Sequence, residues 1–149
     1  MSVMFGSELA AEFLKKFDDP QMRLQALQSV LSCASFDLDY LMDSTATDHV
    51  TVRDPTFDII DGEFKLAALH LVLAYLKTRA ELSGRAASFL TLRRILNCII
   101  AAPFFNTALF VVLNSDVQFD VAFLPLILDI CPNEQTKLEF LSSYLANLG

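Results

Sequence analysis

The chain has 149 residues, of which 54% are apolar and 19% charged, and its formal net charge is −7. This length allows one domain with a full hydrophobic core, and the net negative charge disfavours nucleic acids and anionic membrane surfaces as partners. The first twenty residues lack the basic start and uninterrupted apolar run of a secretory signal, so we expect a cytoplasmic protein.

Two helices are expected in the first thirty-four residues. The first runs over 7–17, with Ser7 as its N-cap, and its apolar side comprises Leu9, Phe13, Leu14 and Phe17. The second begins after the sequence Asp19-Pro20, because aspartate caps helices well and proline fits a first helical position. A short third helix is predicted over 37–44.

The segment 44–60 interrupts this helical pattern. It contains β-branched residues and an Asp-Pro pair and has no helical period, so it predicts a long acidic loop with a short strand over 49–52. Connections of this length are uncommon inside compact domains and are often functional.

Five more helices are predicted after this loop. Their expected starting residues are Asp61, Arg85, Asn106, Asp116 or Asp120, and Asn133. The first of the five is apolar on nearly every face as far as Lys77, so we expect it to be the central helix. Pro125 predicts a kink or a late start in the fourth of them.

The uncharged stretch 95–113 is long enough to cross a bilayer. Pro103 interrupts it, and equally apolar helices are predicted on both sides, so two buried helices around a corner explain it better than a membrane span. If Phe104 and Phe105 at that corner were exposed, they would be a first candidate for a partner contact. We therefore predict an all-α single domain over 1–149 with seven or eight helices.

No pattern in the sequence points to catalysis. Neither histidine has metal ligands at a suitable spacing, and the four glycines are too far apart to form a phosphate-binding loop. The three cysteines, Cys33, Cys98 and Cys131, lie in apolar surroundings and are predicted to be buried free thiols. We therefore expect no enzyme activity, no catalytic residues, no cofactor and no metal.

Charge is unevenly distributed along the chain. Residues 37–63 hold eight acids and one base, whereas residues 77–94 hold five bases and one acid. The bases are Lys77, Arg79, Arg85, Arg93 and Arg94. Either the acidic segment folds over this basic helix junction, or the junction binds an acidic partner or a second copy of the chain, or both blocks are solvated surface.

One stretch resembles a unit of the HEAT-repeat family. In "FLKKFDDPQMRLQALQSVL" a leucine-bearing helix ends at Asp-Pro, and Met22, Arg23, Ala26 and Val30 match the residue types that the family places on its second helix. The resemblance covers 12–31 and implies antiparallel helix pairs that stack on one another. An irregular HEAT- or armadillo-like bundle is therefore one form that the all-α fold can take.

A second stretch, "SGRAASFLTL", resembles the segment that opens the central helix of Bcl-2-like proteins. The match covers Gly84, Arg85, Ala87 and Phe89, while the tryptophan of that family's signature is missing. The resemblance implies a groove that binds an amphipathic helix, with Arg85 facing an acidic residue of that helix.

These patterns together predict a non-enzymatic protein-binding module, such as a scaffold, adaptor or assembly subunit. One predicted surface is the basic junction of Arg79, Arg85, Arg93 and Arg94. The other is the last helix, whose apolar stripe could contact a partner or form a homodimer. The stripe consists of Leu138, Leu141, Tyr144, Leu145 and Leu148, and the residues expected to bind the partner are Leu141, Tyr144, Leu145 and Leu148. A carrier of an apolar small molecule or lipid, with phenylalanines lining a cavity, is the alternative.

Overall fold

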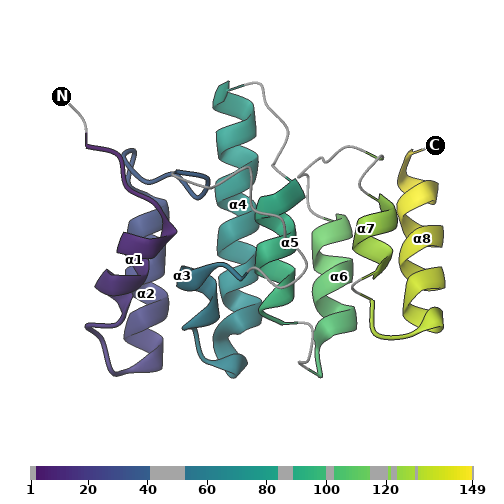
Figure 1. The fold of residues 1–149 in the computed structure, drawn as a ribbon, viewed down its shortest axis with the longest axis horizontal. Coiled ribbons are helices and arrows are strands. Elements are labelled where there is room, and N and C mark those ends of the chain that lie inside the picture. Colours follow the sequence, from purple (N-terminus) through teal and green to yellow (C-terminus); the bar gives the residue numbers. More distant parts are fainter. Residues whose placement is uncertain are drawn as a thin grey trace.

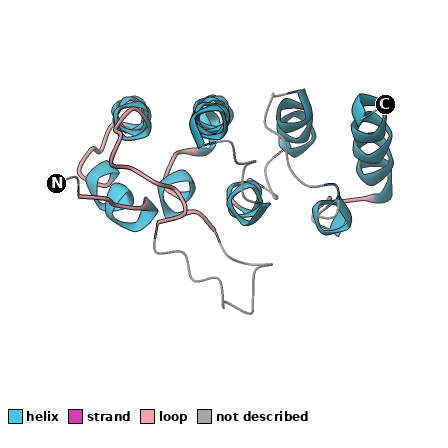
Figure 2. Cartoon of the chain, turned by 90° about the horizontal axis from the view of Figure 1, so that it is seen from above, coloured by secondary structure: helices cyan, strands magenta, loops and turns pink. Residues whose placement is uncertain are grey.

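The computed structural model shows eight α-helices in its described part, arranged as a row of helix pairs. The odd-numbered helices form one layer and the even-numbered helices the other, and the N- and C-terminal pairs lie at opposite ends of the row (Figures 1 and 2). The prediction of an all-α chain with seven or eight helices is thus confirmed. The residues described are 3–40, 53–83, 89–99, 103–114, 121, 124–129 and 131–148.

The first pair consists of α1, Ser7–Leu14, and α2, Pro20–Leu31. The backbone of α1 begins one residue earlier than a Ser7 cap implies, because Gly6 is the N-cap. A Cβ atom at position 6 would lie only 2.9 Å from the carbonyl oxygen of Tyr40, which is too close for a larger residue to replace glycine without a shift. The predicted cap of α2 is confirmed, since the Asp19 carboxylate accepts a hydrogen bond from the Gln21 amide at 3.2 Å.

The inward side of α1 differs from the prediction. Ala10, Ala11 and Leu14 are buried, whereas Leu9 and Phe13 are 48% and 44% exposed. Small alanines allow α1 to lie close to α2 and to the following pair, with which it is in contact. Leu9 and Phe13 are consequently left partly exposed to solvent.

The second pair begins inside the segment predicted to be a loop. Asp54 caps the four-residue helix α3, Pro55–Asp58, and its carboxylate accepts a hydrogen bond from the Phe57 amide at 3.0 Å. Residues 37–40 form a turn where a short helix was expected. The predicted strand over 49–52 lies outside the described residues.

A 3₁₀ turn, η1, Gly62–Phe64, precedes the long helix α4, Lys65–Ser83. Asp61 stands before this turn and makes no side-chain capping bond, so its predicted role as the cap of α4 is wrong. The position of α4 agrees with the prediction, because it packs between α2 and α6 in the even-numbered layer (Figure 2).

The third pair contains the uncharged stretch. Helix α5 is Phe89–Asn97 and α6 is Phe105–Asn114, with Pro103 at the turn before α6. Phe105 is buried and Phe104 is half-buried, so neither forms the exposed corner considered above. Among the described residues, we find no helix with the length and apolar character needed to span a membrane.

The fourth pair is α7, Leu124–Asp129, and α8, Glu134–Leu148. Pro125 is the second residue of α7, where a late helix start places it without a kink. Asn133 caps α8 as predicted, accepting a hydrogen bond from the Thr136 amide at 2.8 Å.

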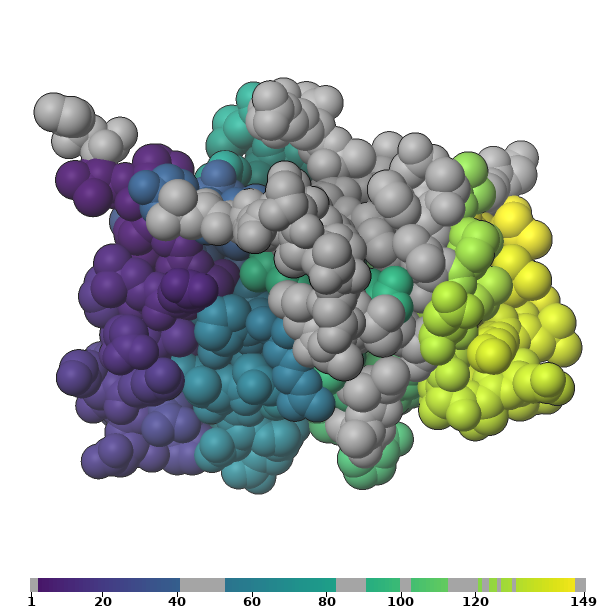
Figure 3. Space-filling model, in the orientation of Figure 1, coloured from purple at the N-terminus to yellow at the C-terminus, as the bar shows by residue number. Residues whose placement is uncertain are grey.

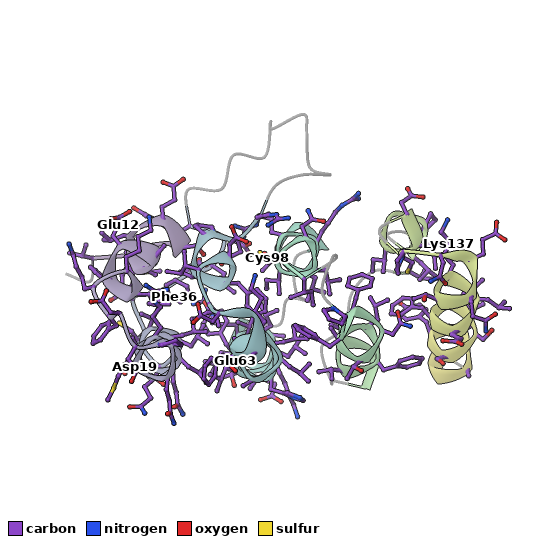
Figure 4. All side chains as sticks on the ribbon, turned by 90° about the horizontal axis from the view of Figure 1, so that it is seen from below. Glu12, Asp19, Phe36, Glu63, Cys98 and Lys137 are labelled. Carbon is purple, nitrogen blue, oxygen red and sulfur yellow. The ribbon has the colours of Figure 1, made fainter. Side chains whose placement is uncertain are left out.

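The core runs continuously along the row. Phe36, which follows α2, is fully buried, and its ring contacts those of Phe5 and Tyr75. Figure 4 shows Phe36 among the side chains of the first two pairs. At the other end, Phe140 and Tyr144 of α8 are buried and stack on each other.

Candidate functional site

Asp54 is the centre of a buried polar network. Its side chain is fully buried and accepts hydrogen bonds from the hydroxyl groups of Ser7, at 2.9 Å, and Thr56. The guanidinium of Arg94 lies 3.4 Å from Oδ2 of the carboxylate, the oxygen that also accepts the hydrogen bond from Ser7. The Asp54 amide also donates to the Arg94 carbonyl oxygen at 3.3 Å. The network therefore joins α1, α3 and α5.

Arg94 extends this network towards the turn after α2. Its Nη2 donates to the Leu38 carbonyl oxygen at 3.1 Å and lies 3.6 Å from the Asp39 carboxylate. The hydroxyl group of Thr91 donates to the same carboxylate. A buried charge needs hydrogen bonds and an opposite charge to offset its lost hydration. These contacts therefore stabilise the fold by pairing the buried Asp54 and Arg94.

The acidic and basic blocks of the sequence thus meet inside the molecule. Arg79 forms an ion pair with Asp37 at 3.4 Å and donates to the Phe36 carbonyl oxygen at 3.1 Å. Arg93 and Arg94 are only 4% and 7% exposed. Their burial corrects the expectation that both could contact a partner from the surface, and Arg85 lies outside the described residues.

An apolar groove lies where α4 extends beyond α2. Both helices run in the same direction, but α4 has 19 residues and α2 has 12, so the C-terminal part of α4 rises above its neighbours (Figure 1). One side of α4 and the end of α2 line a groove with a volume of about 690 Å³. Its described lining residues are Gln28, Leu31, Ser32, Cys33, Ala34, Leu71, Ala74, Tyr75, Thr78, Arg79 and Leu82.

We call this feature the α2–α4 groove. Arg79 is the one charged residue among its described lining residues, and its guanidinium lies 5.6 Å from the centre of the Tyr75 ring. The Arg79 side chain remains 39% exposed, and Leu82 at the rim is 81% exposed. The groove is therefore an open apolar surface with one cation in its wall.

The three cysteines differ in their surroundings. Cys33, predicted to be buried, is exposed and lines the groove. Cys98 and Cys131 are buried as expected. Burial, with a smaller effect of the Asp58 charge, raises the pKa of the Cys98 thiol to about 12, and burial also raises the pKa of Cys131. Cys33 is consequently the accessible thiol of the chain.

The last helix has two apolar sides. Tyr144, predicted to contact a partner, is buried against the core, and Leu141 is half-buried there. Leu145 is 48% exposed, and Leu138, which belongs to the predicted stripe but not to the predicted partner contact, is 58% exposed. The side chain of Leu148 lies outside the described residues.

The chain matches no protein-family model, no characterised protein and no solved structure.

Sequence reasoning missed the α2–α4 groove for an identifiable reason. Helix α4 is apolar on nearly all sides, so its pattern does not reveal which side lacks a neighbour. The unequal lengths of α2 and α4 were the available signal.

Among the described residues, no group of three or more histidine, cysteine, aspartate or glutamate side chains is arranged to hold a metal ion.

Proposed function

We propose that this chain is a non-enzymatic protein-binding module whose α2–α4 groove receives an amphipathic helix of another protein. The observation that carries this proposal is the uncovered, largely apolar side of α4 beyond the end of α2. Amphipathic helices bind such grooves through apolar residues at three- and four-residue spacing.

The dimensions of the groove support a helical occupant. Its lining on α4 extends from Leu71 to Leu82, which is about 16 Å along a helix axis at 1.5 Å per residue. A partner helix of three turns would cover this length. The exposed rim at Leu82 favours a segment that enters along the surface over a molecule enclosed on all sides.

The charge of the groove specifies the chemistry of the partner. Arg79 bonds to Asp37 and to the Phe36 carbonyl oxygen, and its side chain is 39% exposed, so its positive charge is accessible at the wall of the groove. An acidic residue on the partner helix would therefore be favoured beside Arg79. We therefore expect the groove to prefer a partner helix with an apolar side that also carries aspartate or glutamate.

A carrier of an apolar small molecule is the second candidate, because about 690 Å³ lies within the usual range of ligand pockets, roughly 300–1,000 Å³. The described lining residues include no phenylalanine, although phenylalanines were the reason for considering a carrier. Buried phenylalanines such as Phe36 and Phe57 pack in the core instead.

The proposal is tested by a change at the rim. Leu82→Glu places a charge on an exposed apolar site, and we expect partner affinity to fall at least about tenfold, because binding would bury an unpaired carboxylate against the apolar side of the partner helix. The measurement is quantitative affinity purification from native cells, comparing wild type with the variant. His70→Glu is the matched control, because His70 is exposed on α4 and does not line the groove. Equal recovery of the same proteins with both variants would refute the proposal.

A further inference from the structure

The outer side of α8 carries leucines at coiled-coil spacing. Leu138, Leu141 and Leu145 follow one another at intervals of three and four residues, which places them on one stripe of the helix. Leu138 and Leu145 are exposed, and Phe140 and Tyr144 on another side fill the core. Helix α8 thus presents apolar residues to solvent as well as to its neighbours α6 and α7.

The opposite end of the row also carries apolar residues. Leu9 and Phe13 lie one turn apart on α1 and are exposed, whereas the adjacent Ala10 and Leu14 are buried. Phe17 and Met22, at the turn from α1 to α2 and in the first turn of α2, are 43% and 49% exposed. Figure 3 shows the α1–α2 end and the α8 end on opposite sides of the molecule.

Large apolar side chains are exposed on both of these faces. In the even-numbered layer, α2 contacts α4, α4 contacts α6, and α6 contacts α8. Each pair therefore covers an apolar side of its neighbour. In stacked arrays, the apolar face of one unit is normally covered by a neighbouring unit. Here both outer surfaces contain large apolar residues.

We propose that the α8 face of one copy of this chain binds the α1–α2 face of a second copy, so that the row continues from molecule to molecule. A single contact of this kind covers both apolar faces, and it repeats the side-by-side packing already present between pairs. An α8–α8 contact would leave Leu9, Phe13, Phe17 and Met22 uncovered. Because the two faces differ, the assembly is head-to-tail and forms either a ring or a filament.

The test uses one variant for each face. Leu138→Glu with Leu145→Glu blocks the α8 face, and Leu9→Glu with Phe13→Glu blocks the α1–α2 face; Leu9→Glu alone replaces the second variant if circular dichroism shows unfolding. Sedimentation velocity is measured over a concentration series. We expect wild type to form species larger than a dimer and each variant alone to remain monomeric.

A mixture of the two variants gives the sharpest result. Each variant retains one intact face, so an equimolar mixture should form a one-to-one dimer that does not grow further. Ala146→Glu, an exposed change on α8 away from the leucine stripe, should assemble like wild type. A monomeric wild type at the highest concentration, a monomeric mixture, or dimers of the α1–α2 variant alone would overturn the proposal.

Discussion

Replacing Asp54 with alanine should lower the free energy of unfolding by about 3–5 kcal/mol, which is the usual effect of removing one partner of a buried ion pair. The carboxylate is fully buried and accepts hydrogen bonds from Ser7, Thr56 and the Phe57 amide. Without it, the Arg94 guanidinium loses a partner 3.4 Å away in a buried site. Urea denaturation followed by circular dichroism measures the change.

Asp58→Ala is the matched control for this prediction. Asp58 lies on the same short helix and pairs with Arg53 at 3.2 Å and with Lys65 at 3.9 Å, but its side chain is 39% exposed. Solvent screens such pairs, so we expect a loss of no more than about 1 kcal/mol. Similar losses for the two variants would contradict the central role of the buried network. The same reasoning predicts that charge reversal at Arg94 unfolds the chain.

The second large effect is expected for Phe36→Ala, which should cost about 3–5 kcal/mol through the cavity that it leaves. Phe36 is fully buried, and its ring contacts Phe5 and Tyr75 at centre-to-centre distances of 5.5 and 5.7 Å. The midpoint of urea denaturation should fall accordingly.

Phe17→Ala provides the comparison for Phe36→Ala, because Phe17 is 43% exposed. Its carbonyl oxygen accepts a hydrogen bond from Arg23 at 2.8 Å, and the substitution leaves this bond in place. The expected loss is therefore a small fraction of that for Phe36→Ala. If the two variants were equally stable, Phe36 could not be a centre of the core.

Local signals in the sequence predicted two helix caps correctly, whereas the predicted caps Ser7 and Asp61 were wrong. Asp19 with Pro20, and Asn133, cap helices where expected. Arg23, selected through the HEAT-repeat resemblance, bonds to Phe17 in its own pair and to Ile59 of the next pair. The stacked pairs are the arrangement which that resemblance implies, although no family model matches the chain. The Bcl-2-like resemblance begins at Gly84 and Arg85, outside the described residues.

The face of α1 could not be assigned from hydrophobicity alone. Leu9 and Phe13 are more apolar than Ala10 and Ala11, but close packing between helices favours the small side chains. Helix α3 has only four residues, too few for a helical period to appear in the sequence.

The sequence pattern also could not show which charged residues meet when they lie far apart along the chain. The pattern raised an internal fold-over as one option, but the pairing of Asp54 with Arg94 spans 40 positions, and that of Asp37 with Arg79 spans 42. Whether charged residues at such separations meet inside a protein depends on how the pairs stack. The α2–α4 groove therefore replaces the basic junction as the candidate binding surface.

The most direct measurement of partner binding in this groove is photo-crosslinking from Cys33. A maleimide carrying a photoreactive group should attach there, because Cys98 and Cys131 are buried. After irradiation in native cell extract, mass spectrometry should identify an amphipathic partner segment with an acidic residue, and Leu82→Glu should remove that product. Crosslinks that persist unchanged in Leu82→Glu, or that reach only small molecules, would contradict a groove that binds a protein helix.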